Sequence, residues 1–183
     1  MHVAFITAYD PESPYQVSLP PLGIGYLSAY LKRECWFAET SFHHTIEELI
    51  DAKPDMVAVS STTEHFHHAT DIARKAKEAL GVPVIGGGMH LTSLPHILPE
   101  PYDLGVIGEG EKTLVDIVNL YNEVKKPGPQ EFRKLKGVTF HDENGEVVIG
   151  PSQDLIRDMD TLPYPDRELI DEGWKVPSWD TVH

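Results

Sequence analysis

Short apolar runs alternate along this chain with longer amphipathic segments, and this alternation restricts the possible fold more than any other feature. Five runs have the composition of β-strands, at residues 3–7, 36–39, 55–60, 82–85 and 104–107. Helical patterns lie between and after them, at residues 22–33, 45–52, 65–80 and 112–124. Strands that alternate with helices predict a parallel sheet that is covered by helices on both faces.

The order of these elements favours a flavodoxin-like fold. We predict an α/β, doubly wound parallel sheet of five strands in the order 2-1-3-4-5, in which right-handed crossovers bring every strand-to-helix loop to one edge. A hairpin signal, Glu143-Asn144-Gly145, lies between two later apolar runs. We therefore expect an α/β domain at residues 1–126, a C-terminal β-hairpin at 127–150 and an extended linker at 151–183.

Charge and cysteine content bear on the partners of the chain. The 183 residues include 29 acidic and 15 basic side chains, which gives a formal net charge of −14. Nucleic acids and anionic membrane surfaces bind to clustered Lys and Arg, so we expect neither as a partner. No apolar run approaches the ~20 residues that cross a bilayer. The single cysteine, Cys35, rules out an internal disulfide and favours a cytoplasmic location.

Glycine-rich loops are expected where the strands end. Ligands of open parallel sheets bind beyond the carboxyl ends of the strands, and four loops reach that edge, at residues 8–21, 60–64, 86–90 and 108–111. The run Gly86-Gly87-Gly88 is the most informative, because three glycines after a buried strand cost conformational entropy. They suit a ligand that lies against the backbone, or a tight strand-to-helix turn.

Two glutamates occur in the last of these loops, Gly108-Glu109-Gly110-Glu111. Both precede or begin a predicted helix, where the helix dipole favours carboxylates. We expect this stabilising role for Glu111, whereas Glu109, between two glycines, is the better candidate to face a ligand.

The histidines cluster without the spacing of a known metal site. His43 and His44 are adjacent, and His65, His67 and His68 lie close together, but the chain has no HExxH sequence and no Cys/His tetrad. We expect surface or capping roles for them and predict no metal ligand. A GxSxG nucleophile sequence is also absent, and no catalytic residue is predicted.

Two other functions remain open at this point. A receiver-like signalling module has this topology, but it needs an Asp to phosphorylate after the third strand, and residues 60–64 contain none. A nucleotide-binding or flavin-binding enzyme domain can use the glycine turn at residues 86–88. The chain nevertheless lacks GxGxxG after the first strand and lacks a P-loop sequence.

Several segments, taken in chain order, carry a family resemblance. They are PPLGIGYLSAYL at residues 20–31, GGGMHLT at 86–92, VIGEGE at 106–111 and LPYPDR at 162–167. The first three resemble the N-terminal cobalamin-binding domain of cobalamin-dependent radical S-adenosylmethionine (SAM) enzymes. The fourth looks like the bridge from that domain into the catalytic barrel.

The resemblance implies that cobalamin is the ligand and that it sits on the carboxyl edge, with its nucleotide tail between sheet and helices. The cofactor-binding residues implied in this way are Tyr9, Tyr15, Leu22, Gly23, Ser60, Ser61, Thr62, Gly86, Gly87, Gly88, His90, Gly108, Glu109 and Gly110. Residues 60–62 would meet the tail, and the first loop with residues 22–25 would border the corrin ring.

One stretch departs from a second group of cobalamin domains. Domains of the methionine synthase and mutase type carry DxHxxG after the first strand, and that His ligates cobalt. The corresponding stretch here is DPESPY at residues 10–15, with Glu12 in the His position. The resemblance to radical enzymes, which commonly lack this His, therefore implies a cobalt without a protein His ligand.

The catalytic half of the family is not found in this sequence. That half carries CxxxCxxC for a four-iron four-sulfur cluster, and the chain contains no such motif. The resemblance implies that the chain was truncated before a C-terminal radical SAM barrel, which would be its partner in the same polypeptide. We expect the fragment to bind cobalamin without catalysing a reaction, while the cluster, SAM and the methyl-transfer or ring-forming chemistry belong to the barrel.

Overall fold

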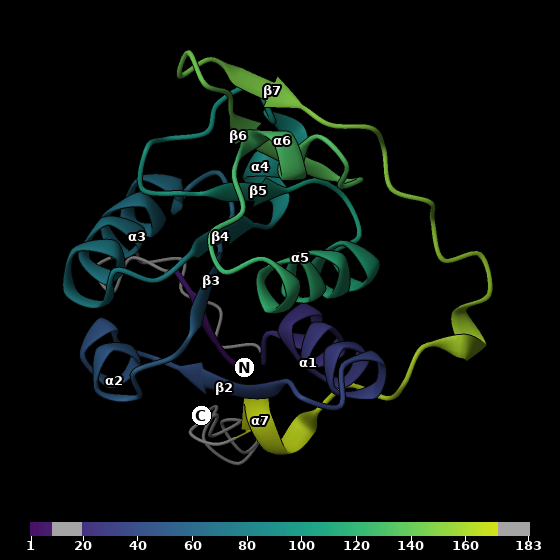
Figure 1. Cartoon of the computed structure of the whole chain (residues 1–183). Helices are drawn as coiled ribbons and strands as arrows, with labels where there is room; N and C mark the ends of the chain where they lie inside the picture. Colours follow the sequence, from purple (N-terminus) through teal and green to yellow (C-terminus); the bar gives the residue numbers. More distant parts are fainter. Residues whose placement is uncertain (9–19, 172–183) are drawn as a thin grey trace.

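A mixed sheet forms the centre of the computed structural model, which describes residues 1–8 and 20–171 (Figure 1). Its seven described strands run in the order β2-β1-β3-β4-β5-β6-β7. The parallel part comprises β1 (His2–Thr7), β2 (Glu39–His43), β3 (Met56–Ser60), β4 (Val84–Gly87) and β5 (Leu104–Val106). The antiparallel part comprises β6 (Val138–His141) and β7 (Val147–Ile149).

The predicted fold class and the predicted order of the five parallel strands are confirmed. The predicted size of the sheet, five strands, is wrong, because the hairpin of β6 and β7 does not stand apart from it. β6 pairs with β5, with Gly105 opposite Thr139, and so extends the same sheet to seven strands. The proposed division at residues 126 and 150 stays a prediction.

Helices cover both faces of the sheet, as Figure 1 shows. One face carries α1 (Leu22–Glu34) and α5 (Glu111–Glu123), and the other carries α2 (Ile46–Asp51) and α3 (Phe66–Leu80). The shorter helices are α4 (Met89–Ser93), α6 (Pro129–Phe132), α7 (Arg167–Asp171) and the 3-10 helix η1 (Met159–Thr161).

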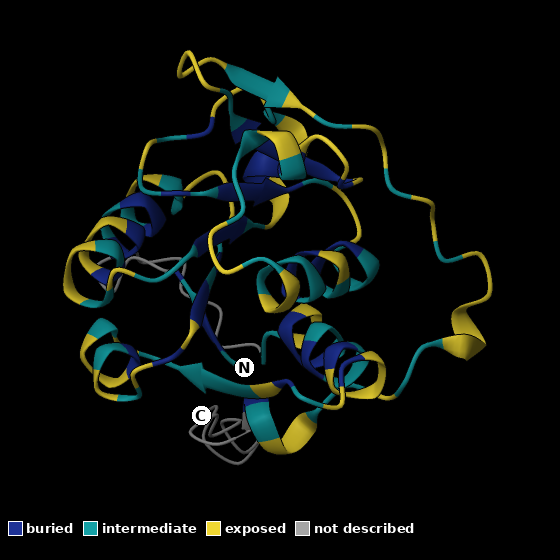
Figure 2. Ribbon diagram, in the orientation of Figure 1, coloured by how far each residue is buried: buried dark blue, intermediate teal, exposed yellow. Residues whose placement is uncertain are grey.

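Strand alternation divides the apolar core into two layers. In β1, Val3 and Phe5 belong to the cluster under α1 and α5, whereas Ala4 and Ile6 belong to the cluster under α2 and α3. This follows from the period of two in a strand, which sends successive side chains to opposite faces. In Figure 2 the buried residues accordingly concentrate in the strands and on the inner sides of the helices.

The edge strand β2 lies a few residues later than the sequence predicted. Trp36, at the start of the predicted strand, is 91% exposed and lies in a turn. The strand that pairs with β1 begins at Glu39, opposite His2. Its sequence, ETSFH, is only half-buried, and therefore carries little of the apolar signal that marks a central strand.

Residues 151–171, which we call the strap, return to the domain instead of leaving it (Figure 1). The Asp166 carboxylate accepts hydrogen bonds from Ser28 Oγ (2.8 Å) and Lys32 Nζ (2.6 Å), both on α1. Ile170 is fully buried in the core cluster under α1 and α5. Its Cδ1 atom would lie 3.0 Å from a Cβ at Gly25, so a glycine in α1 allows this close approach. The described part of the predicted linker is thus packed on this domain.

We expect Ile170→Ala to lower the free energy of unfolding by about 2–5 kcal/mol, because it removes a large buried side chain and leaves a cavity. Chemical denaturation of the chain measures this change. The matched control is Leu155→Ala in the same strap, where the side chain is 69% exposed and a change within about 0.5 kcal/mol is expected. If Ile170→Ala lowers the free energy of unfolding as little as Leu155→Ala does, Ile170 is not part of the core.

Candidate ligand-binding pocket

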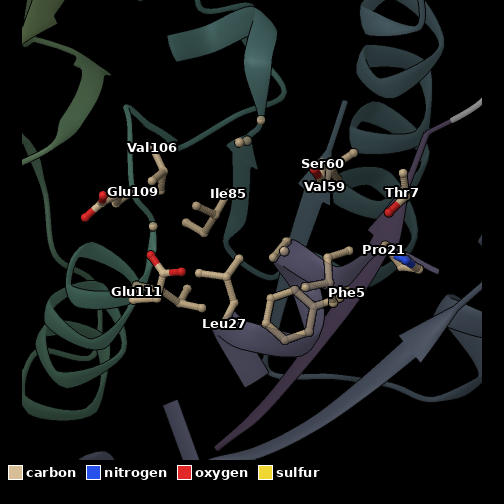
Figure 3. Close-up of a pocket in the computed structure, with 18 of the residues that line it drawn as sticks. Phe5, Thr7, Pro21, Leu27, Val59, Ser60, Ile85, Val106, Glu109 and Glu111 are labelled. Carbon is tan, nitrogen blue, oxygen red and sulfur yellow. The ribbon is translucent and has the colours of Figure 1, made fainter. Parts of the chain in front are cut away.

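A cavity of about 400 Å³ lies at the carboxyl edge of the sheet, between the strands and the helices α1 and α5 (Figure 3). Four neighbouring parallel strands, β1, β3, β4 and β5, end at this cavity, and the first turns of the two helices close its other side. This is the position in which open parallel sheets bind their ligands.

The deep wall of the cavity is apolar. Phe5 pairs with Ala58, and Ala58 pairs with Ile85, so the three side chains form a row across β1, β3 and β4. Val106 continues the wall on β5, and the helices add Ile24, Leu27 and Leu114. The sequence placed residues 22–25, which include Ile24, beside the corrin ring, but it did not single out the other apolar side chains of the wall as lining a ligand site.

Backbone contact between two loops shapes the upper wall. Gly88 has a φ of +98°, and a Cβ on it would lie 2.4 Å from the carbonyl oxygen of Ser61. The Ser61 N–H also donates to the carbonyl oxygen of Gly87 (3.2 Å). The loops after β3 and β4 therefore pack backbone against backbone, which only a glycine at position 88 permits.

Two other glycines face open space. A Cβ on Gly23 or Gly87 would meet no atom within 4 Å, and neither residue has a positive φ. Packing within the described part of the chain therefore does not require a glycine at either position. Both residues line the cavity, so the missing side chains leave volume that a ligand can occupy.

Four polar side chains, those of Thr7, Ser60, Glu109 and Glu111, line the cavity. The Thr7 hydroxyl is buried and has no hydrogen-bond partner within residues 1–8 and 20–171. Figure 3 shows the Glu111 carboxylate directed toward the cavity and the Glu109 carboxylate on its outer side. Glu109 accepts a hydrogen bond from the N–H of Ile156 in the strap (3.0 Å). As predicted, Glu111 stands in the first turn of α5, and contact of either glutamate with a ligand stays a prediction.

The structure brings most of the predicted cofactor-binding residues together. Those that line the cavity are Gly23, Ser60, Gly86, Gly87, Gly88, Gly108, Glu109 and Gly110. Those that are described but lie outside its wall are Leu22, Ser61, Thr62 and His90. Tyr9 and Tyr15, like Glu12 in the cobalt-ligand position, lie outside the described residues. Contact of any of them with a ligand stays a prediction.

His90 packs within the protein. Its ring stacks on Phe66, with the ring centroids 3.7 Å apart and an interplanar angle of 22°. Neither ring nitrogen has a hydrogen-bond partner among the described residues, although both are buried. Burial lowers the pKa of His90, because desolvation disfavours the imidazolium. The neutral ring thus joins the beginnings of α3 and α4 as an aromatic packing residue.

Residues 1–8 and 20–171 contain neither a cluster of metal ligands nor a membrane-spanning helix. No three His, Cys, Asp or Glu side chains of these ranges are grouped so that they could hold a metal ion. None of the helices in the same ranges combines the length and the apolar character needed to cross a membrane.

A family model and a curated relative both match most of this chain. The family model of the B12 binding domain matches residues 14–118. Uncharacterized methyltransferase PH0819 of Pyrococcus horikoshii is 30% identical over 162 residues, which cover 82% of this chain and 34% of that protein. The chain therefore spans about a third of the length of this curated relative.

Solved structures of OxsB, a cobalamin-dependent S-adenosylmethionine radical enzyme, have the same fold. The TM-score is 0.72 for the structure with aqua-cobalamin and S-adenosylmethionine and 0.73 for the structure with aqua-cobalamin. The identity is 22% in both cases, and the match covers 93% of this chain and 25% of OxsB.

We expect Gly88→Ala to lower the free energy of unfolding by about 1–3 kcal/mol. The substitution places a Cβ atom on a residue with positive φ, and this atom would clash with the backbone of Ser61. Denaturant titration measures the loss. Gly87→Ala is the matched control, and its Cβ meets nothing within 4 Å, so the expected change is within about 0.5 kcal/mol. Similar losses at both positions would contradict the loop contact.

We expect His90 to make the stability depend on pH. Because its pKa is lowered in the folded protein, the unfolded chain binds the proton more readily, and stability falls as the pH drops below the ordinary His value of about 6.5. The slope from one group is at most about 1.4 kcal/mol per pH unit. His90→Phe keeps an aromatic ring and removes the titration. Unfolding measured at pH 7 and pH 5 should show a smaller loss in the variant, and an identical loss would contradict this assignment.

Proposed function

The chain belongs to the B12 binding domain family, and on that premise we propose that it holds cobalamin at the carboxyl edge of its sheet, as the cofactor-binding part of a radical SAM enzyme. One observation carries this proposal. A cavity with an apolar wall lies between the sheet and α1 and α5, and Gly23 and Gly87 leave space in it that packing of the described residues does not use.

The residues around the cavity fit part of the cofactor. A volume of about 400 Å³ is within the range of small-molecule pockets but is too small for a whole cobalamin. It suits the nucleotide tail, whose flat aromatic base matches the apolar wall, while the corrin ring remains outside on the edge of the sheet. The unpartnered Thr7 hydroxyl supports this arrangement, because a buried polar group without a partner is costly unless a ligand completes its hydrogen bonds.

Specific residues would hold the two parts of the cofactor. Leu27 and Leu114 would pack against the base, and the backbone at Gly87 and Gly88 would allow the ligand a close approach. The hydroxyls of Thr7 and Ser60 would bind polar atoms of the tail. Residues 108–110 and the first turn of α1 would border the corrin ring. Bound cobalamin supplies a cobalt centre, and the residues of this chain orient that centre and limit the access of water to it.

The lower face of cobalt is proposed to have no protein His ligand. His90, the one histidine among the predicted site residues, is buried against Phe66. The sequence holds Glu12 where other cobalamin domains hold the ligand His. Ser61, Thr62, Leu22, Tyr9 and Tyr15 keep their proposed places near the cofactor.

A larger protein is proposed around this domain. The chain corresponds to 34% of the methyltransferase relative and 25% of OxsB, which leaves room for a radical SAM barrel with its iron–sulfur cluster and SAM. The name of the P. horikoshii relative, a methyltransferase, supports methyl transfer as the reaction class, with ring formation as the alternative. The single thiol Cys35, which is free and buried, agrees with a cytoplasmic protein.

Titration of the chain with hydroxocobalamin tests the proposal. We expect a change in the cobalamin absorbance spectrum that saturates at tens of micromolar or below. Gly87→Leu should weaken binding at least tenfold, because the new side chain enters space that the ligand needs. Ala79→Leu adds bulk at an exposed position of α3 and should leave the affinity unchanged. The proposal fails if the native chain causes no spectral change, or if Gly87→Leu binds as tightly as the native chain.

A further inference from the structure

Glu111 is a charged residue in an apolar setting. It begins α5 and is half-buried, and it lines the cavity together with Leu27 and Leu114. Figure 3 shows its carboxylate directed into the cavity on the side of Leu27. An acidic residue in the first turn is favoured by the helix dipole, but the dipole does not fix the direction of the side chain.

The possible partners of this carboxylate are engaged elsewhere. Lys112, the next residue, donates to the carbonyl oxygen of Asp154 in the strap (3.1 Å). The strap N–H of Ile156 donates to Glu109 (3.0 Å). Among residues 1–8 and 20–171, Glu111 takes part in no ion pair or side-chain hydrogen bond. The cavity therefore holds an acceptor to which no side chain of the described residues donates.

An unpaired carboxylate restricts the ligand that can lie beside it. Removing it from water costs free energy unless a donor replaces the lost hydrogen bonds. An anionic group cannot do this, because it brings no donor of its own and two like charges repel. The ligand group next to Glu111 must therefore be uncharged or cationic, and it must carry an N–H or O–H.

Cobalamin meets this requirement over part of its surface. Its peripheral carboxamides and its ribose hydroxyl are uncharged donors, whereas its phosphate is an anion. Flavin mononucleotide (FMN), a ligand of other domains with this topology, ends in a doubly charged phosphate. Thr7, whose hydroxyl also has no partner among the described residues, lies on the strand side of the cavity, where a hydroxyl can serve either as donor or as acceptor.

We propose that Glu111 is a specificity-determining residue, whose carboxylate accepts a hydrogen bond from an uncharged N–H or O–H group of cobalamin and disfavours anionic ligands. The inference rests on the proposed function and adds to it the residue that orients the ligand. The hydrogen bond to Glu111 would turn the carboxamides or the ribose of cobalamin toward α5 and its phosphate away from α5.

Titrations of native chain, Glu111→Leu and Glu111→Gln with hydroxocobalamin test this role. Loss of a charged hydrogen bond predicts that Glu111→Leu weakens binding roughly ten- to a hundredfold. Glu111→Gln keeps a carbonyl acceptor and should recover part of that loss. Glu123→Gln, at the exposed far end of α5, is the matched control and should bind like the native chain.

Two further measurements separate this role from its alternatives. The midpoint temperature of unfolding without ligand should change by less than about 4 °C in Glu111→Leu. The variant loses the favourable interaction of the carboxylate with the helix dipole, but it also no longer holds an unpaired charge in the cavity, and these two effects on stability oppose each other. A merely structural residue would lower stability together with affinity. FMN should bind to the native chain at least tenfold more weakly than hydroxocobalamin.

The outcomes distinguish the inference from the function on which it rests. If the native chain does not bind hydroxocobalamin, the proposed function and the inference both fail. If the native chain binds it and Glu111→Leu binds it equally well, only the inference is overturned. Equal affinity of the native chain for FMN and hydroxocobalamin would also overturn the inference, as would a joint loss of stability and affinity in Glu111→Leu.

Discussion

Parallel pairing of β1, β3, β4 and β5 is the constraint on which the rest of the structure depends. Strands that run in one direction end at one edge, so their last residues meet although they are far apart in the sequence. The same pairing aligns Phe5, Ala58 and Ile85 in a row beneath that edge. Position in the sheet, more than any single motif, therefore brings the loops and the apolar wall together in one cavity.

The cavity combines tight contacts with space that the described residues leave unfilled. Gly88 is held against the Ser61 backbone. In contrast, Gly23 and Gly87 face open volume, and Thr7 has a buried hydroxyl without a described partner. A core that served stability alone would fill that volume and pair that hydroxyl. Membership of the B12 binding domain family gives these features a common explanation, because a bound ligand would supply the missing contacts.

The sequence predicted the parts of this site that have a local signal. Glycines directly after apolar runs identified residues 86–88 and 108–110, because chain direction alone places such loops at the ligand edge. Leu27 and Leu114 could not be singled out, since periodicity shows that they face inward but not how far α1 and α5 stand from the sheet. Ile170 was missed because a helix of five residues shows no period. The orientation of Glu109 depends on a contact with Ile156 of the strap, which lies 47 residues away along the chain.

The position of cobalamin on the chain tests the account most directly. Hydrogen–deuterium exchange of the whole chain, with and without hydroxocobalamin, locates the segments that the ligand covers. The account predicts slower exchange at residues 86–88, at residues 108–111 and in the first turn of α1, with no change in α2. Protection confined to α2 and α3 would contradict it, as would saturating binding without protection at the carboxyl edge.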